Sequence, residues 1–172
     1  VVMGAVLGVI TFCIQGSEQW DGTHVATSMV MWALLFAMFF IPAYPGAGYE
    51  VRGNGEMFPL NGPSWSLFFE YIGNILYALF IRRLSTKALT VFVVLLGICL
   101  ACFAIFDVSG YGMIEVGWTL DSGNFVGGLL RMLFPFSLGL LLSRNFKPVK
   151  VRGAFWICSF VLLVLFCVPY VE

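Results

Sequence analysis

Apolar residues gather along this chain in six runs that are separated by short polar or turn-rich segments. The runs cover residues 1–14, 25–41, 64–81, 88–106, 125–143 and 154–171. A helix needs roughly 17 to 25 apolar residues to cross a hydrocarbon core of about 30 Å, and the last five runs reach that length. The pattern predicts an all-α protein, a polytopic transmembrane bundle of about six helices.

The first run is the shortest, and it starts at Val1 without an initiator methionine or the basic region that opens a signal peptide. We therefore expect a spanning helix that is cut on its N-terminal side. Residues 1–172 are then part of a single membrane-embedded domain, truncated at the N-terminus and continued beyond the C-terminus. Gly4 and Gly8 form a G-x-x-x-G pattern, which is typical of a close-packing face.

The composition agrees with a membrane location. Hydrophobic residues make up 60% of the chain, charged residues 10%, and the mean hydropathy is +0.97, whereas a soluble domain carries about 25% charged residues. Nine basic residues balance nine acidic ones, so the chain lacks the basic face that nucleic-acid binding requires. We expect no nucleic-acid partner.

The five cysteines all lie inside apolar runs, where a thiol packs as a small hydrophobic group. Cys99 and Cys102 form a C-x-x-C pattern, but no second pair or nearby histidine completes a zinc site. We expect these cysteines to serve as apolar packing groups, and we expect no disulfide framework and no metal.

The charges of the connecting segments predict the orientation, because cytoplasmic loops collect Lys and Arg. The segments 82–87 and 144–152 are basic and are expected in the cytoplasm. The mainly acidic segments 42–63 and 107–121 are expected outside. Counting crossings then places residues 15–24 in the cytoplasm, although this segment has no basic residue.

Two ionisable residues, Glu70 and Arg131, lie inside predicted spans. Such a position costs from about 2.5 kcal/mol upward and by default marks a functional site. Each lies six residues along a helix that enters from the outer side, which is roughly 9 Å. At this matching depth the two side chains either form an ion pair that fixes helix register, or line a polar cavity, or do both.

The third predicted helix carries a polar face. It consists of Ser66, Glu70, Gly73, Asn74 and Tyr77, which fall within about 100° of one another. Lipid offers these groups no partner, so the face is expected to look into the bundle. Pro135 removes the N–H that would bond the Arg131 carbonyl, and it is expected to kink the fifth helix.

The chain's one histidine, His24, follows Asp21 and Thr23 at the start of the second predicted helix. We interpret it as an interfacial residue near a helix cap, with Asp21 and Thr23 as capping residues; a general base is the alternative. Basic loop residues are expected to contact membrane lipid, or alternatively a phosphate-bearing ligand. They include Arg82, Arg83 and Arg144.

Residues 60–70 read Leu-Asn-Gly-Pro-Ser-Trp-Ser-Leu-Phe-Phe-Glu and are followed by Asn74 and Tyr77. This stretch resembles the N-G-P-x-W-S-L-x-x-E-x-x-x-N-x-x-Y signature of the acyltransferase family 3 membrane proteins. Residues 39–42 are similar to the helix end before that family's extracytoplasmic loop, and residues 131–139 to its R-x-x-x-x-F-x-x-G helix. The candidate substrate-cavity residues are Asn61, Trp65, Ser66, Glu70, Asn74, Tyr77 and Arg131.

The resemblance implies a multi-pass protein of the bacterial inner (plasma) membrane that acts as an O-acyltransferase. Members move an acyl group, often acetyl from acetyl-CoA, onto a sugar hydroxyl of a cell-surface or exported glycoconjugate. The implied partners are acyl-CoA as donor, a carbohydrate or glycoconjugate acceptor and membrane lipid. No bound cofactor is implied.

The chain departs from the family pattern at the catalytic histidine. The family's histidine lies in its first membrane helix, about ten residues after an Arg or Lys, and nothing in residues 1–14 matches this pattern. We expect that helix upstream of Val1, so that the catalytic residue is unknown and these 172 residues alone lack the general base that O-acylation needs.

Two other classes remain as alternatives. Intramembrane charges and a proline-broken helix are also typical of a secondary transporter or channel segment, against which the W-S-L-x-x-E signature argues. A purely structural membrane subunit does not explain two ionisable residues at one depth.

Overall fold

The computed structural model describes residues 1–110, 116–147 and 152–167. In these ranges the chain forms six α-helices and one 3₁₀ turn, and the pairing between extended segments is limited to two isolated bridges. The elements are α1 Val2–Ile14, α2 Thr27–Met38, α3 Ser64–Leu79, η1 Ile81–Arg83, α4 Thr86–Ile105, α5 Ser122–Asn145 and α6 Ala154–Cys167. The all-α prediction is confirmed.

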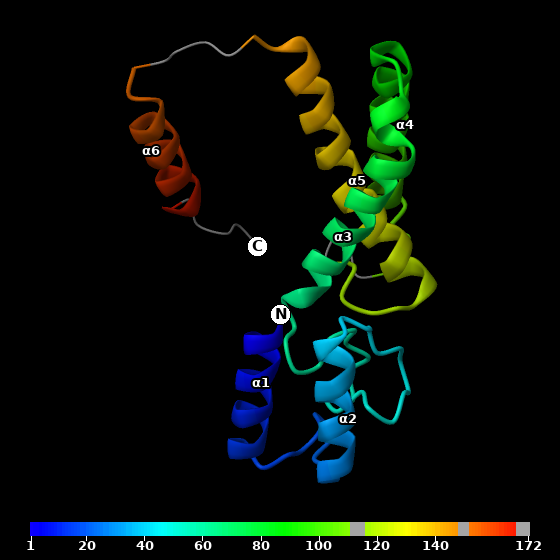
Figure 1. Ribbon diagram of the computed structural model, residues 1–172, viewed down its shortest axis with the longest axis vertical. Helices are drawn as coiled ribbons and strands as arrows, with labels where there is room; N and C mark the ends of the chain where they lie inside the picture. Colours follow the sequence, from blue (N-terminus) through cyan, green and yellow to red (C-terminus); the bar gives the residue numbers. More distant parts are fainter. Residues whose placement is uncertain (111–115, 148–151, 168–172) are drawn as a thin grey trace.

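Three helical segments in the described ranges are long and apolar enough to cross a membrane: Ser64–Arg83, Thr86–Ile105 and Ser122–Asn145. The helix α5 packs against both α4 and α3 (Figure 1). Glycines allow the close approach, because a Cβ at Gly73 would lie 2.6 Å from the Met132 sulfur and one at Gly128 only 2.5 Å from the Phe69 ring. This three-helix unit contains the candidate membrane spans of the described chain.

The other three helices are short in the described chain. The helices α1, α2 and α6 have 13, 12 and 14 residues, or about 18 to 21 Å at 1.5 Å per residue. The prediction of a full span over residues 25–41 is wrong, since α2 ends at Met38 and Phe40 takes a φ of 58°. The helix α6 is described as far as Cys167, and the rest of its predicted run lies outside the described residues.

The helices α1 and α2 form a lobe at one end of the molecule, and the segment after α2 folds back onto them (Figure 1). Val51 and Leu60 of this segment are buried against Phe12 of α1 and Val30 of α2. The Arg52 Nε donates a hydrogen bond to the Pro59 carbonyl at 3.1 Å. The segment is therefore a packed part of the lobe.

The α1–α2 connection lies on the same side of the molecule as the segment 42–63. The Trp20 N–H donates to the Arg52 carbonyl at 3.1 Å, and the Gln19 side chain lies against Gly53. The prediction that residues 15–24 lie across the membrane from segment 42–63 is therefore wrong. It rested on counting two full crossings, which helices of 13 and 12 residues do not make.

The expected capping of α2 also differs. The helix begins at Thr27 after Ala26, which provides no side-chain cap. The Asp21 carboxylate instead accepts from the Thr23 N–H at 2.9 Å, a bond that closes a turn within the loop and lowers the pKa of Asp21. His24 is exposed in this loop, and its backbone pairs with that of Glu18 in an isolated antiparallel β-bridge.

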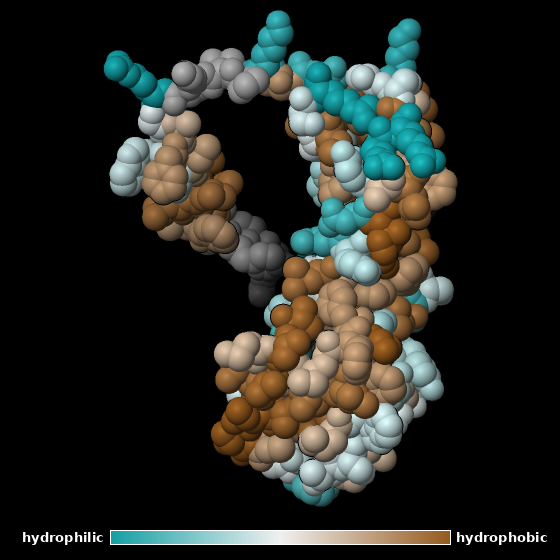
Figure 2. Space-filling model, in the orientation of Figure 1, coloured by the Kyte–Doolittle hydropathy of each residue, from teal (hydrophilic) through white to brown (hydrophobic). Residues whose placement is uncertain are grey.

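Apolar side chains cover much of the outer surface (Figure 2). The helix α6 buries none of its described residues and stands apart from the others (Figure 1). All five cysteines are free and exposed on this apolar surface. A surface of this kind suits lipid or further apolar segments.

Candidate functional site

A cleft of about 410 Å³ opens between α3 and α5. Its lining mixes polar and apolar groups from both helices. The residues are Trp65, Ser66, Phe69, Glu70 and Asn74 of α3 and Gly128, Arg131, Met132, Pro135 and Phe136 of α5. Clefts of about 300 to 1,000 Å³ with a few polar groups among apolar ones are typical of ligand sites.

The α3 wall follows from a four-residue spacing, because Ser66, Glu70 and Asn74 lie one turn apart on the same helix face. The Asn74 amide donates to the Glu70 carbonyl at 2.9 Å, and the Ser66 hydroxyl donates to the Pro63 carbonyl at 3.0 Å. Both side chains are thus fixed to their own helix. The Glu70 carboxylate is exposed on this wall.

The α5 wall is built around Arg131. Its guanidinium lies over the Trp65 ring at 5.4 Å from the centroid, within cation–π range. Pro135, four residues further along the same helix, also lines the cleft, although α5 continues through it. The cleft therefore presents a carboxylate from one helix and a guanidinium from the other.

The start of α5 is held by a hydrogen-bond network. The Asp121 carboxylate caps the helix and accepts from the Asn124 N–H at 3.0 Å, from the Asn124 amide at 2.6 Å and from the Thr119 hydroxyl. The Asn124 side-chain oxygen in turn accepts from the Gly117 N–H at 3.2 Å. The network fixes the residues before α5 to its first turn.

These bonds set the charge of Asp121. Burial alone raises the pKa of this carboxyl, but the hydrogen bonds from the backbone of Asn124, the hydroxyl of Thr119, the amide of Asn124 and the backbone of Gly123 together bring the pKa below its ordinary value. Asp121 therefore carries its negative charge throughout the neutral pH range.

The two acidic loops are fastened to each other beside the cleft. The Met57 N–H donates to the Trp118 carbonyl at 2.8 Å, and Glu56 and Thr119 form an antiparallel bridge. A small cavity of about 150 Å³ lies at this junction, and it shares Trp65 with the cleft. Gly62, two residues before α3, also lines this small cavity.

Of the seven candidate residues, the structure brings five to the cleft: Trp65, Ser66, Glu70, Asn74 and Arg131. Tyr77 lies further along α3 and packs against the Phe136 ring with centroids 6.2 Å apart. Asn61 lies instead against α1, where its amide donates to the Val1 carbonyl at 3.4 Å.

His24 lies in the α1–α2 loop and is not brought to the cleft. The described parts of the basic segments lie at the end of the bundle away from the α1–α2 lobe (Figure 1). There the Arg144 Nη1 donates to the Leu84 carbonyl at 2.7 Å, while Arg82 and Arg83 are exposed. Among the described residues, no group of three or more His, Cys, Asp or Glu side chains is placed to hold a metal ion.

Trp118 and Asp121 also lie near the site, although the sequence pattern did not predict them there. An aspartate three residues before Asn124 at the start of an apolar run is an N-cap signal that was available. Nothing in the sequence indicates that Trp118 approaches Trp65, because that contact depends on how the two loops fold together.

Comparison with known proteins adds one result. A family model described as an acyltransferase domain matches residues 2–172. No curated protein and no solved structure matches the chain.

Proposed function

The chain belongs to acyltransferase family 3, whose model covers residues 2–172, and we propose that it moves an acetyl group from acetyl-CoA to a sugar hydroxyl of a cell-surface or exported glycoconjugate. An acyltransferase with membrane-spanning helices is what the family match and the fold establish. The donor, the acceptor and a place in the inner membrane are the proposal.

The observation that carries the proposal is the cleft between α3 and α5. A sugar presents hydroxyl groups that both donate and accept hydrogen bonds, together with an apolar ring face. The Glu70 carboxylate accepts such bonds, the Arg131 guanidinium donates them, and the Trp65 ring provides a flat apolar surface. A neutral polyhydroxyl acceptor therefore suits this lining.

The reaction sets what the chain must do. The acceptor oxygen attacks the thioester carbonyl carbon, the carbon–sulfur bond breaks, and the hydroxyl proton passes to the departing CoA thiolate. We assign Glu70 and Arg131 to holding the acceptor so that one hydroxyl faces the thioester, since positioning of reactants supplies much of the acceleration in group transfer.

The basic end of the bundle supports a cytoplasmic donor. The bond from Arg144 to the Leu84 carbonyl joins the end of α5 to the segment that carries Arg82 and Arg83. CoA carries phosphates, which guanidinium groups bind well. We assign this end of the molecule to the CoA moiety.

The test uses the intact protein reconstituted in proteoliposomes with radiolabelled acetyl-CoA and the glycans extracted from its source membrane. We expect labelled acetyl on a glycan. Glu70→Gln and Arg131→Gln should each lower kcat/KM at least about tenfold, because each removes a charged hydrogen bond to the acceptor.

The double variant should lose less than the product of the two single losses, since both residues act on one ligand. Glu18→Gln removes an exposed carboxylate far from the cleft and should keep the wild-type rate. Absence of labelled glycan, or wild-type rates in both cleft variants, would contradict the proposal.

A further inference from the structure

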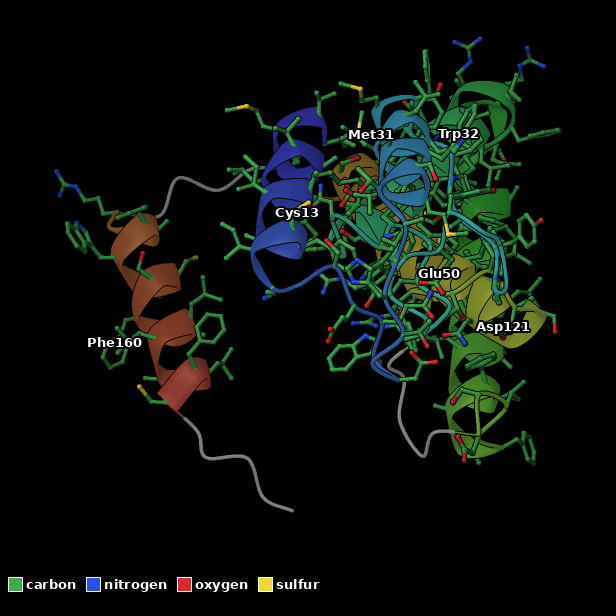
Figure 3. All side chains as sticks on the ribbon, turned by 90° about the horizontal axis from the view of Figure 1, so that it is seen from below. Cys13, Met31, Trp32, Glu50, Asp121 and Phe160 are labelled. Carbon is green, nitrogen blue, oxygen red and sulfur yellow. The ribbon has the colours of Figure 1, made fainter. Side chains whose placement is uncertain are left out.

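A second cavity, which we call the loop cavity, lies where three loops meet. Its volume is about 540 Å³, and its lining comes from residue 19, from residues 45–55 and from residues 118–121. Figure 3, viewed from the side of the α1–α2 lobe, shows Glu50 and Asp121 in the same region of the molecule. The acyl-transfer proposal above makes no use of this cavity.

The loop cavity is polar and acidic. Its side chains include two carboxylates, Glu50 and Asp121, and two amides, Gln19 and Asn54, and its lining contains no Lys or Arg. An anionic ligand would meet only negative charge here. A neutral ligand with many hydroxyl groups would find acceptors and donors on several sides.

Glu50 presents a fixed carboxylate to the loop cavity. Its side chain is only 6% exposed, and the N–H groups of Arg52 and Gly53 both donate to the same oxygen, Oε1, at 3.1 Å. The Oε2 atom accepts no hydrogen bond from the described residues. The Oε2 atom is not among the buried side-chain atoms that lack a partner in the described chain. It is therefore open to the loop cavity that Glu50 lines, where it can accept a hydrogen bond from a ligand hydroxyl.

The loop cavity adjoins the α3–α5 cleft through two tryptophans. Trp118 lines both the loop cavity and the small cavity at the loop junction, and Trp65 lines both that junction and the cleft. Flat aromatic rings stack on the apolar faces of sugars. The loop cavity, the junction cavity and the cleft thus form a continuous row, in which hydrogen-bonding groups and aromatic rings alternate.

We propose that the loop cavity binds the distal sugars of a neutral oligosaccharide acceptor while its reacting sugar lies in the α3–α5 cleft. This inference rests on the proposed function for the identity of the reaction. It adds that the substrate is a chain of several sugars, that Trp118 is one of its stacking surfaces, and that the distal units carry no phosphate or carboxylate.

The test compares acceptor lengths in the intact protein in proteoliposomes. The glycan that accepts label is trimmed to a series from one to four sugars, and kcat/KM is measured for each. We expect kcat/KM to rise with length. Trp118→Leu should lower the value for the tetrasaccharide roughly three- to tenfold, as expected for loss of aromatic stacking, and should lower that for the monosaccharide less.

Two controls separate binding from folding. Trp20→Leu changes a tryptophan that is 76% exposed and lines none of the three cavities, so the length dependence should stay. Trp118→Phe keeps an aromatic face and should restore most of the preference for long acceptors.

The outcomes are distinct for the two proposals. Transfer to glycans without any length preference, or equal losses for short and long acceptors in Trp118→Leu, would overturn the distal subsite and leave the transferase proposal standing. A preference for acceptors with a uronate or phosphate at the distal end would also overturn it. Absence of transfer to every glycan would instead refute the proposed function.

Discussion

At the scale of single residues, Gly8 decides how α1 meets the rest of the lobe. A Cβ at this position would lie 1.7 Å from the Leu60 carbonyl oxygen. The sequence pattern of Gly4 and Gly8 predicted a close-packing face, and the structure shows that loop backbone and the Asn61 side chain, and not another helix, occupy it.

Replacing Gly8 should therefore destabilise the lobe. Gly8→Ala forces a methyl group against backbone that has little room to move, and we expect a loss of about 1 to 3 kcal/mol. Gly139→Ala is the matched control, since a Cβ there meets nothing within 4 Å and alanine favours a helix over glycine. Thermal unfolding in detergent measures both; equal midpoints would show that the close contact is absent.

Glu70 and Arg131 show what residue spacing can and cannot predict. Their equal distance from the outer helix ends predicted a common depth, and they line one cleft. The expectation placed them inside a bundle, but both are exposed in the described chain. Spacing along two helices gives depth, whereas burial depends on every segment that packs around them.

At the scale of elements, the three spanning segments α3, α4 and α5 were predictable to within a few residues because turn or charged residues bound their apolar runs. The apolar run over residues 25–41 did not predict where α2 ends. Hydropathy stays high as far as Ile41, while the backbone leaves the helix after Met38 so that the following loop can pack back on the lobe. Apolar content alone does not distinguish residues that continue a helix from residues of a loop that packs on the lobe.

The N-cap of α5 gives a pH-dependent prediction. The folded-state pKa of Asp121 is lowered, so its contribution to stability is complete above the ordinary aspartate pKa and is lost as the pH falls through the lowered folded value. Asparagine is also a good N-cap, so Asp121→Asn removes mainly the negative charge at the helix N-terminus and should destabilise the protein by about 0.3 to 1 kcal/mol at neutral pH. The difference from wild type should shrink in acid.

Unfolding in detergent between neutral and acidic pH measures that difference. Glu18→Gln, which removes an exposed carboxylate outside the network, controls for the general loss of one negative charge. A wild-type advantage that stays constant down to strongly acidic pH would show that the Asp121 charge does not stabilise α5.

At the scale of the whole molecule, the described parts of the two basic segments lie at one end, and the described parts of the two acidic loops are hydrogen-bonded together at the other (Figure 1). This agrees with the alternation that the charge pattern predicted. The α1–α2 loop joins the acidic side, which sequence could not reveal because the charges of Glu18 and Asp21 contribute little to orientation.

Cysteine labelling in intact cells tests this arrangement. In a background without the five native cysteines, Trp20→Cys should react with an impermeant reagent from outside, whereas Lys87→Cys should react only after permeabilisation. Protection of Trp20→Cys in intact cells would contradict this arrangement, because it would show that the α1–α2 loop is cytoplasmic and that α1 and α2 each cross the membrane.

The central claim is that the acceptor sugar lies in the cleft between α3 and α5, and substrate protection tests it most directly. Ser66→Cys places a thiol in the cleft, and Ser109→Cys places one in the outer loop, away from the three cavities; both sites are half-buried. In the cysteine-free protein, saturating acceptor should slow labelling of Ser66→Cys several-fold without changing that of Ser109→Cys, and the label at Ser66→Cys should abolish transfer. Equal labelling rates with and without acceptor, or full transfer by the labelled protein, would contradict the claim.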